Sequence, residues 1–98
     1  MSKVEYEAMT DQELNLAIAE IKSGTPKEEL RFAPPDYLHD DGATWRALME
    51  MPYPDLHQNY PTGLWMCSCD SLLRRAPGQE SAERVVWLCW LAWKEARP

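Results

Sequence analysis

The feature that most constrains this chain is an uninterrupted apolar run of nine residues near the C-terminus, Val85–Trp93. Ser81 is a suitable N-cap, and the spacing of the residues after it predicts a helix that runs to about Ala96. The run is about half as long as a helix that crosses a bilayer, so no membrane span is expected. A helix that is apolar nearly all round has to be covered nearly all round.

The two sides of this predicted helix carry different residues. On a helical wheel, one side holds mostly small or branched apolar side chains: Ala82, Val85, Val86, Cys89, Ala92, Trp93 and Ala96. Trp87, Trp90 and Leu91 lie on the opposite side. If the first side rests on a sheet, these three form an exposed partner-binding surface, and a twofold homodimer is the simplest partner. If the N-terminal helix or the segment 52–62 covers them, they belong to the core.

The length of 98 residues sets the scale of the fold. A chain of this size buries roughly 60–65% of the surface that its unfolded form exposes. That permits one modest core and disfavours a multi-layered enzyme with a deep cleft. No low-complexity tract or linker divides the chain, so we expect a single domain over residues 1–98.

The first helix is indicated by its terminal residues. Thr10 followed by Glu13 fits a capping box, in which each side chain satisfies a backbone donor at the start of a helix. Gly24 supplies a left-handed stop, and together these signals predict a helix over residues 11–23. Its apolar residues form one stripe: Leu14, Ala17, Ile18 and Ile21. This helix should therefore dock by a single face.

A second helix is predicted over residues 42–50. Prolines between residues 25 and 39 disfavour a long helix there and indicate a loop. Asp40 and Asp41 follow this loop and are suitable helix caps. The predicted helix carries apolar side chains on one face: Trp45, Leu48 and Met49.

Strands are predicted in the second half of the chain. Residues 64–70 alternate at the period of two that is typical of a strand, and a second strand fits residues 72–75. That second strand is either the partner arm of a tight turn or a continuation past a bulge. The proline-rich segment 51–63 is interpreted as a surface connection, and residues 76–79 as a turn. The predicted fold is α+β, with about three helices and a small antiparallel sheet of two to three strands packed between them, an α-β-α layered sandwich.

Five short motifs stand in a recognisable order. They are Met9–Leu14 at the start of a helix that ends near Gly24, Pro35–Asp40 followed by Thr44–Leu48, Leu64–Cys67 in a strand, and Ser81–Arg84 at the start of the last helix. This order resembles the phage ABA sandwich domain family of small phage and prophage proteins. The resemblance implies a sheet between helices and a phage or prophage origin. It implies no catalytic residues.

The whole chain has a formal net charge of −6, and its acidic side chains are concentrated in the first half. Residues 1–55 hold twelve acidic and five basic side chains, whereas residues 56–98 hold four and five. This balance argues against direct nucleic-acid binding. Asp36, Asp40 and Asp41 are candidates for a surface that binds a basic groove on a host or phage protein and imitates phosphate. Solvation and favourable placement at helix starts explain the same carboxylates without a partner.

The cysteines and histidines offer an alternative chemistry. Cys67 and Cys69 lie on one face of the predicted strand, and with Cys89 and the histidines they supply enough ligands for zinc, although their spacing is not that of a usual zinc motif. His39, beside acidic residues, fits a general base, with Cys67 or Cys69 as a nucleophile. Packing as small apolar residues explains the thiols equally. No catalytic residue, metal ligand or cofactor is predicted.

The sequence thus predicts a non-enzymatic phage or prophage accessory protein that acts by protein–protein interaction. One expected action is inhibition of a host or anti-phage defence component through the acidic or tryptophan-rich surface. The alternative is a small cytosolic enzyme or metal-binding protein that uses His39, Cys67 and Cys69. The N-terminal residues lack the apolar core of a signal peptide, so a cytoplasmic location is expected.

Overall fold

The computed structural model describes residues 6–31, 33–70 and 74–96 of the chain. Within these residues the helices are α1 (Asp11–Ser23), α2 (Asp41–Glu50) and α3 (Ala82–Ala96), and the strands are β1 (Asp55–Gln58), β2 (Trp65–Cys69) and β3 (Arg74–Gln79). One-turn 3₁₀ helices lie at Tyr6–Ala8, Lys27–Glu29 and Tyr37–His39. The predicted α+β class, with three helices and a small antiparallel sheet, is confirmed.

Local capping residues define the helix starts. At α1, the Glu13 backbone N–H donates to Thr10 Oγ1 at 3.2 Å and the Thr10 N–H donates to Glu13 Oε1 at 3.0 Å, which completes the predicted capping box. Gly24 ends the helix in the left-handed conformation, with φ of 71°. The bounds of α1 are those predicted from the sequence.

The other two helices begin in the same way. Asp40 Oδ1 accepts a hydrogen bond of 3.0 Å from the Ala43 N–H, and α2 begins at Asp41, one residue before its predicted start. Ser81 Oγ accepts a hydrogen bond of 3.2 Å from the Arg84 N–H at the start of α3. Asp40, a candidate for partner binding, therefore has a structural role at the α2 N-terminus.

The sheet is antiparallel throughout, in the order β1-β2-β3. Leu56 pairs with Cys67, and Cys67 pairs with Ala76, so these three residues form a row across the sheet. Cys67 and Ala76 are buried and Leu56 is partly buried, which identifies this side as the core face. An irregularity between Trp65 and Cys67 shifts the register to β3.

Two interpretations of the strand region were wrong. The segment 51–63 contains β1, and the residues predicted as a turn at 76–79 belong to β3. Both strands are edges of the sheet, where a proline such as Pro77 removes no obligatory hydrogen bond of the ladder. Of the strand predicted at 72–75, residues 72 and 73 lie outside the described residues, and Arg74–Gln79 forms the antiparallel partner of β2.

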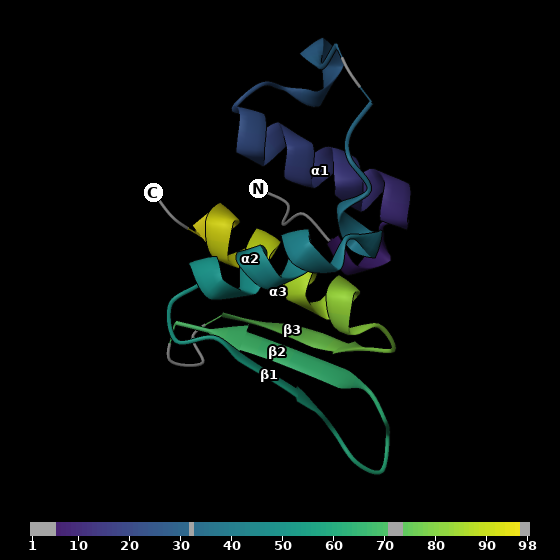
Figure 1. Ribbon diagram of the computed structural model, residues 1–98, viewed down its shortest axis with the longest axis vertical. Helices are drawn as coiled ribbons and strands as arrows, with labels where there is room; N and C mark the ends of the chain where they lie inside the picture. The colour runs from purple at the N-terminus through teal and green to yellow at the C-terminus, as the bar shows by residue number, and fades with distance from the viewer. Residues whose placement is uncertain (1–5, 32, 71–73, 97–98) are drawn as a thin grey trace.

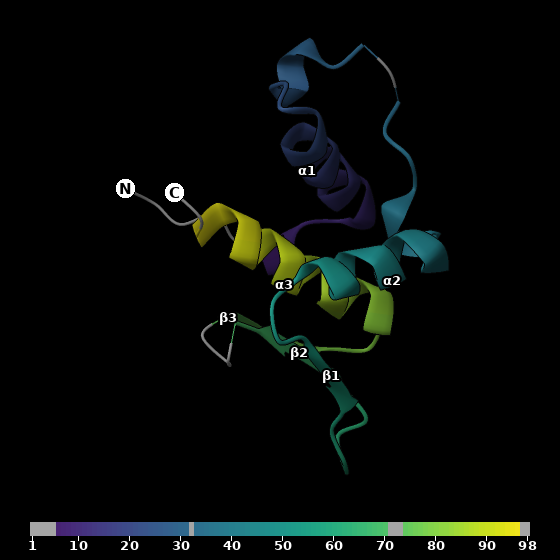
Figure 2. The ribbon, with the colours of Figure 1, turned by 60° about the vertical axis from the view of Figure 1, so that its left-hand side comes forward.

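The layer order differs from the predicted sandwich, in which helices lie on both faces of the sheet. Figures 1 and 2 show the sheet at one end of the molecule, α3 against one of its faces, α2 beside α3, and α1 farther away on the same side. The physical reason lies in α3, which is apolar nearly all round. It forms the middle layer, with strands on one side and the other helices on the other.

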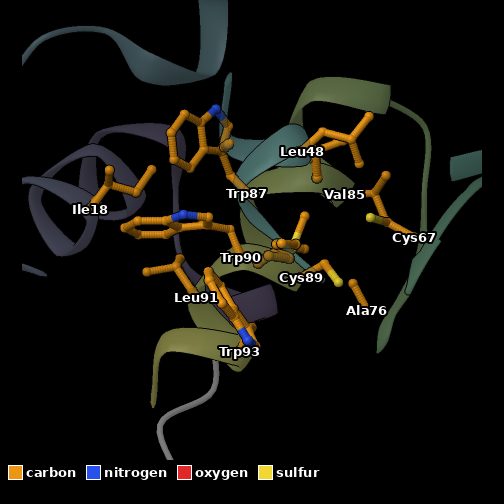
Figure 3. Close-up of a cluster of buried hydrophobic side chains, with 14 of the residues drawn as sticks. Ile18, Leu48, Cys67, Ala76, Val85, Trp87, Cys89, Trp90, Leu91 and Trp93 are labelled. Atoms are coloured by element: carbon orange, nitrogen blue, oxygen red, sulfur yellow. The ribbon is translucent and has the colours of Figure 1, made fainter. Parts of the chain in front are cut away.

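The tryptophans of α3 belong to the core. Trp87 and Leu91 are 0% exposed and Trp90 is 1% exposed. Figure 3 shows Ile18 of α1 beside the two indoles, while Cys67 and Ala76 lie on the far side of α3. The prediction that Trp87, Trp90 and Leu91 form an exposed partner-binding surface is therefore wrong for the folded chain. The N-terminal helix covers them, as in the other interpretation of the wheel.

Candidate functional site

Three adjoining surface cavities lie where the helices meet. They measure about 540, 260 and 290 Å³. The first and second share Asp11 and His39, and the second and third share Asp41 and Glu83. Four carboxylates along these cavities are named here the acidic band: Asp11, Asp36, Asp41 and Glu83. Of the predicted partner-binding residues, the band unites Asp36 and Asp41.

His39 lies between the first two cavities and is held by a carboxylate on each side. Its Nδ1 is 2.8 Å from Asp36 Oδ2, and its Nε2 is 3.8 Å from Asp11 Oδ2. The hydrogen bond to Asp36, followed by the charges of nearby carboxylates, raises the pKa of His39 above its ordinary value. The carboxylate that orients the imidazole is thus Asp36, rather than Asp40 or Asp41, the acidic residues that directly follow His39 in the sequence.

Asp36 is itself fixed by a buried asparagine on α1. Asn15 Nδ2 donates to Asp36 Oδ1 at 3.1 Å, and Asn15 Oδ1 accepts from the Leu38 N–H at 3.3 Å. The hydrogen bond from His39, and then that from Asn15, lowers the pKa of Asp36. Asn15 was not predicted as a site residue, because its burial and its partners depend on the packing of the Asp36–Leu38 segment against α1.

Arg84 connects α3 to the start of α1. Its Nη1 is 2.7 Å from Asp11 Oδ1, and its Nη2 donates to the carbonyl oxygens of Glu7 and Met9. Its Nε donates to Gln79 Oε1 at 3.2 Å. The guanidinium thereby neutralises one carboxylate of the acidic band. No local sequence motif predicts that Arg84 joins α3 to α1, because its partners near the start of α1 are more than 70 residues away in the sequence.

The third cavity combines an apolar wall with two carboxylates. Its apolar lining comes from α2, β1 and α3: Trp45, Leu48, Leu56, Ala82 and Val86. Asp41 and Glu83 also line it, and neither forms a salt bridge among the side chains that the structure describes. Trp45 is 63% exposed, and Met49, one turn later on α2, is 57% exposed. A cation or an apolar group can contact the protein here.

The cysteines lie apart from the acidic band. Cys67 and Cys69 are buried under α3, and Cys89 Sγ is 3.8 Å from Cys69 Sγ. A hydrogen bond with Cys67, followed by burial, raises the pKa of Cys89. His39 is exposed and contacts carboxylates, so the structure does not bring it together with the thiols. Over the described ranges, no group of three or more His, Cys, Asp or Glu residues is arranged to hold a metal ion.

No protein-family model, no curated protein and no solved structure matches this chain. The geometry of the chain itself therefore carries the functional argument. Among the helices that the structure describes, none combines the length and the apolar character needed to span a membrane.

Proposed function

We propose that this chain is a non-enzymatic binding protein that recognises a basic segment of another protein. The observation that carries the proposal is the third cavity, where the exposed face of α2 adjoins the Asp41 and Glu83 carboxylates. An arginine or lysine side chain placed there would meet the Trp45 ring and a carboxylate at once. Both interactions favour a cationic partner over a neutral one.

The charge distribution supports the same partner class. Twelve of the sixteen acidic side chains lie in residues 1–55, and the acidic band draws three of its four carboxylates from this segment. An acidic surface accelerates the approach of a basic partner and disfavours nucleic acid. The partner surface is therefore the acidic band with Trp45 and Met49, in place of the α3 tryptophans.

The biological setting is part of the proposal. A phage or prophage accessory protein that acts on a basic host or phage protein, in the host cytoplasm, agrees with the small size and the acidic surface. Imitation of phosphate by the carboxylates would let such a protein inhibit a host or defence component that binds nucleic acid. This setting comes from the resemblance to the phage ABA sandwich domain family.

The test is a nuclear magnetic resonance titration with a basic peptide of alternating arginine and leucine. Amide signals of Asp41 and Glu83 and the indole signal of Trp45 should shift first. The double variant Asp41→Asn, Glu83→Gln should weaken binding about tenfold, because two charge interactions at the surface of the third cavity are lost. Affinity should also fall as salt rises.

A matched control is the double variant Asp55→Asn, Glu80→Gln, which removes the same charge at exposed positions outside the acidic band. It should bind the peptide nearly as tightly as the parent chain. Equal losses in the two double variants would show that net charge alone attracts the peptide. That result would contradict a defined site at the third cavity.

A further inference from the structure

Three aromatic rings meet at the boundary between α1 and α3. The Tyr37 and Trp87 ring centroids are 5.5 Å apart with an interplanar angle of 57°, and those of Trp87 and Trp90 are 5.3 Å apart at 76°. Rings at such angles pack in tilted or edge-to-face contact rather than in a parallel stack. We name this group, Tyr37, Trp87 and Trp90, the aromatic cage.

The ammonium group of Lys22, in the last turn of α1, lies within reach of all three faces. Its Nζ is 5.9 Å from the Tyr37 centroid, 5.7 Å from that of Trp87 and 5.3 Å from that of Trp90. Cation–π attraction acts within about 6 Å of a ring centroid. Among the side chains that the structure describes, Lys22 forms no salt bridge.

The two indoles of the cage are fixed by hydrogen bonds that do not involve Lys22. Trp87 Nε1 donates to Thr44 Oγ1 at 3.0 Å and to the Tyr37 carbonyl at 3.1 Å. Trp90 Nε1 donates to Glu50 Oε1 at 2.9 Å. The geometry of the cage should therefore persist when the lysine side chain is removed or turns away.

A carboxylate adds negative potential beside the cage. Glu50 is hydrogen-bonded to Trp90 and is 2.8 Å from Lys94 Nζ. Partial burial acts to raise the pKa of Glu50, but the hydrogen bonds from Lys94 and Trp90 and the charges of Lys94 and Lys22 outweigh it and lower that pKa. The carboxylate is thus ionised at neutral pH and favours a cation nearby.

We infer that Tyr37, Trp87 and Trp90 form a binding site for an alkylammonium cation, which Lys22 of the same chain occupies in this structure. The ligand class is an ammonium group on an alkyl chain, with N-methylated and quaternary forms included, because these are weakly hydrated and suit aromatic faces. The Lys22 side chain is exposed and lies one residue before the end of α1, so it can leave without unfolding the helix. This inference is independent of the function proposed for the acidic band.

The first experiment vacates the cage and offers a probe. Lys22→Ala is titrated with choline while the indole signals of Trp87 and Trp90 are followed by nuclear magnetic resonance. Choline should bind this variant about tenfold more tightly than the parent chain, in which Lys22 competes. The neutral isostere 3,3-dimethylbutan-1-ol should bind the variant about tenfold more weakly than choline. Equal binding of the two probes, or no binding of choline, would overturn the inference.

Arg46→Ala is the matched control, because it removes an exposed cationic side chain of α2 that is not part of the aromatic cage. This variant leaves Lys22 in the cage, so it should gain no affinity for choline. A gain equal to that of Lys22→Ala would show that the loss of any positive charge has the same effect.

A measurement on the parent chain keeps the inference testable if Lys22→Ala does not fold. Ring currents from three faces should move the ε-methylene proton signals of Lys22 upfield of their positions in the urea-unfolded chain. Signals at the unfolded positions would show that the ammonium is not in the cage and would overturn the inference.

Discussion

Two tryptophans on neighbouring helices have opposite environments. Trp87 on α3 is 0% exposed, and Trp45 on α2 is 63% exposed. The Trp87 indole N–H has two acceptors, Thr44 Oγ1 and the Tyr37 carbonyl, within 3.1 Å. Trp87 thus stabilises the fold beneath the elements that cover it, whereas Trp45, which is largely uncovered, presents its ring at the surface.

The largest expected effect is that of Trp87→Ala. This substitution removes a fully buried side chain and leaves two acceptors without their donor, so the free energy of unfolding should fall by about 3–5 kcal/mol. Urea denaturation followed by circular dichroism measures the loss. A change smaller than about 1 kcal/mol would contradict the central place of Trp87 in the core.

A smaller loss of stability is expected for Asn15→Ala, at the boundary between core and surface. The buried amide holds both Asp36 and the Leu38 N–H, so its removal should lower the free energy of unfolding by about 1–3 kcal/mol. Gln12→Ala, at an exposed position of the same helix, should change it by less than about 0.5 kcal/mol. Similar losses for the two variants would show that helix propensity, rather than the buried contact, is being measured.

At the surface, the stability of the fold should depend on pH through His39, whose pKa is raised by its hydrogen bond to Asp36. Because the folded pKa exceeds the ordinary value of 6.5, the stabilisation by this pair is fully present below about pH 6.5 and disappears as pH rises through the folded pKa. It also disappears in acid, as pH falls through the lowered pKa of Asp36. In Asp36→Asn, the pKa of His39 measured by nuclear magnetic resonance should fall. An unchanged value would show that Asp36 does not hold the imidazole.

The smallest effect on stability is expected for Trp45→Ala. Most of this side chain is exposed, so the free energy of unfolding should change by about 0.5 kcal/mol or less. The same substitution should reduce binding of the arginine–leucine peptide, because one wall of the third cavity is lost. A large loss of stability with unchanged peptide binding would reverse the contrast between the two tryptophans.

The local elements were predictable because their signals act over short distances in the chain. The capping box of α1 spans only four residues, from Thr10 to Glu13, and Ser81 similarly marked the start of α3. The α+β class followed from these helices and from the alternation around Trp65 and Cys67. The edge strand β1 was missed because its proline-rich flanks indicate a loop when its pairing partner is not considered.

By itself, the sequence determined that α3 is a helix that is apolar nearly all round, so that a single packed element cannot cover it. It also determined that negative charge is concentrated before residue 56. Only the tertiary structure decided that the sheet packs against one side of α3 and that α1 covers Trp87 and Trp90 on the other side. It also decided that Arg84 meets Asp11, 73 residues away, and that Trp45 stays exposed. Capping and periodicity involve residues a few positions apart, whereas burial depends on which distant segments fill the space around a side chain.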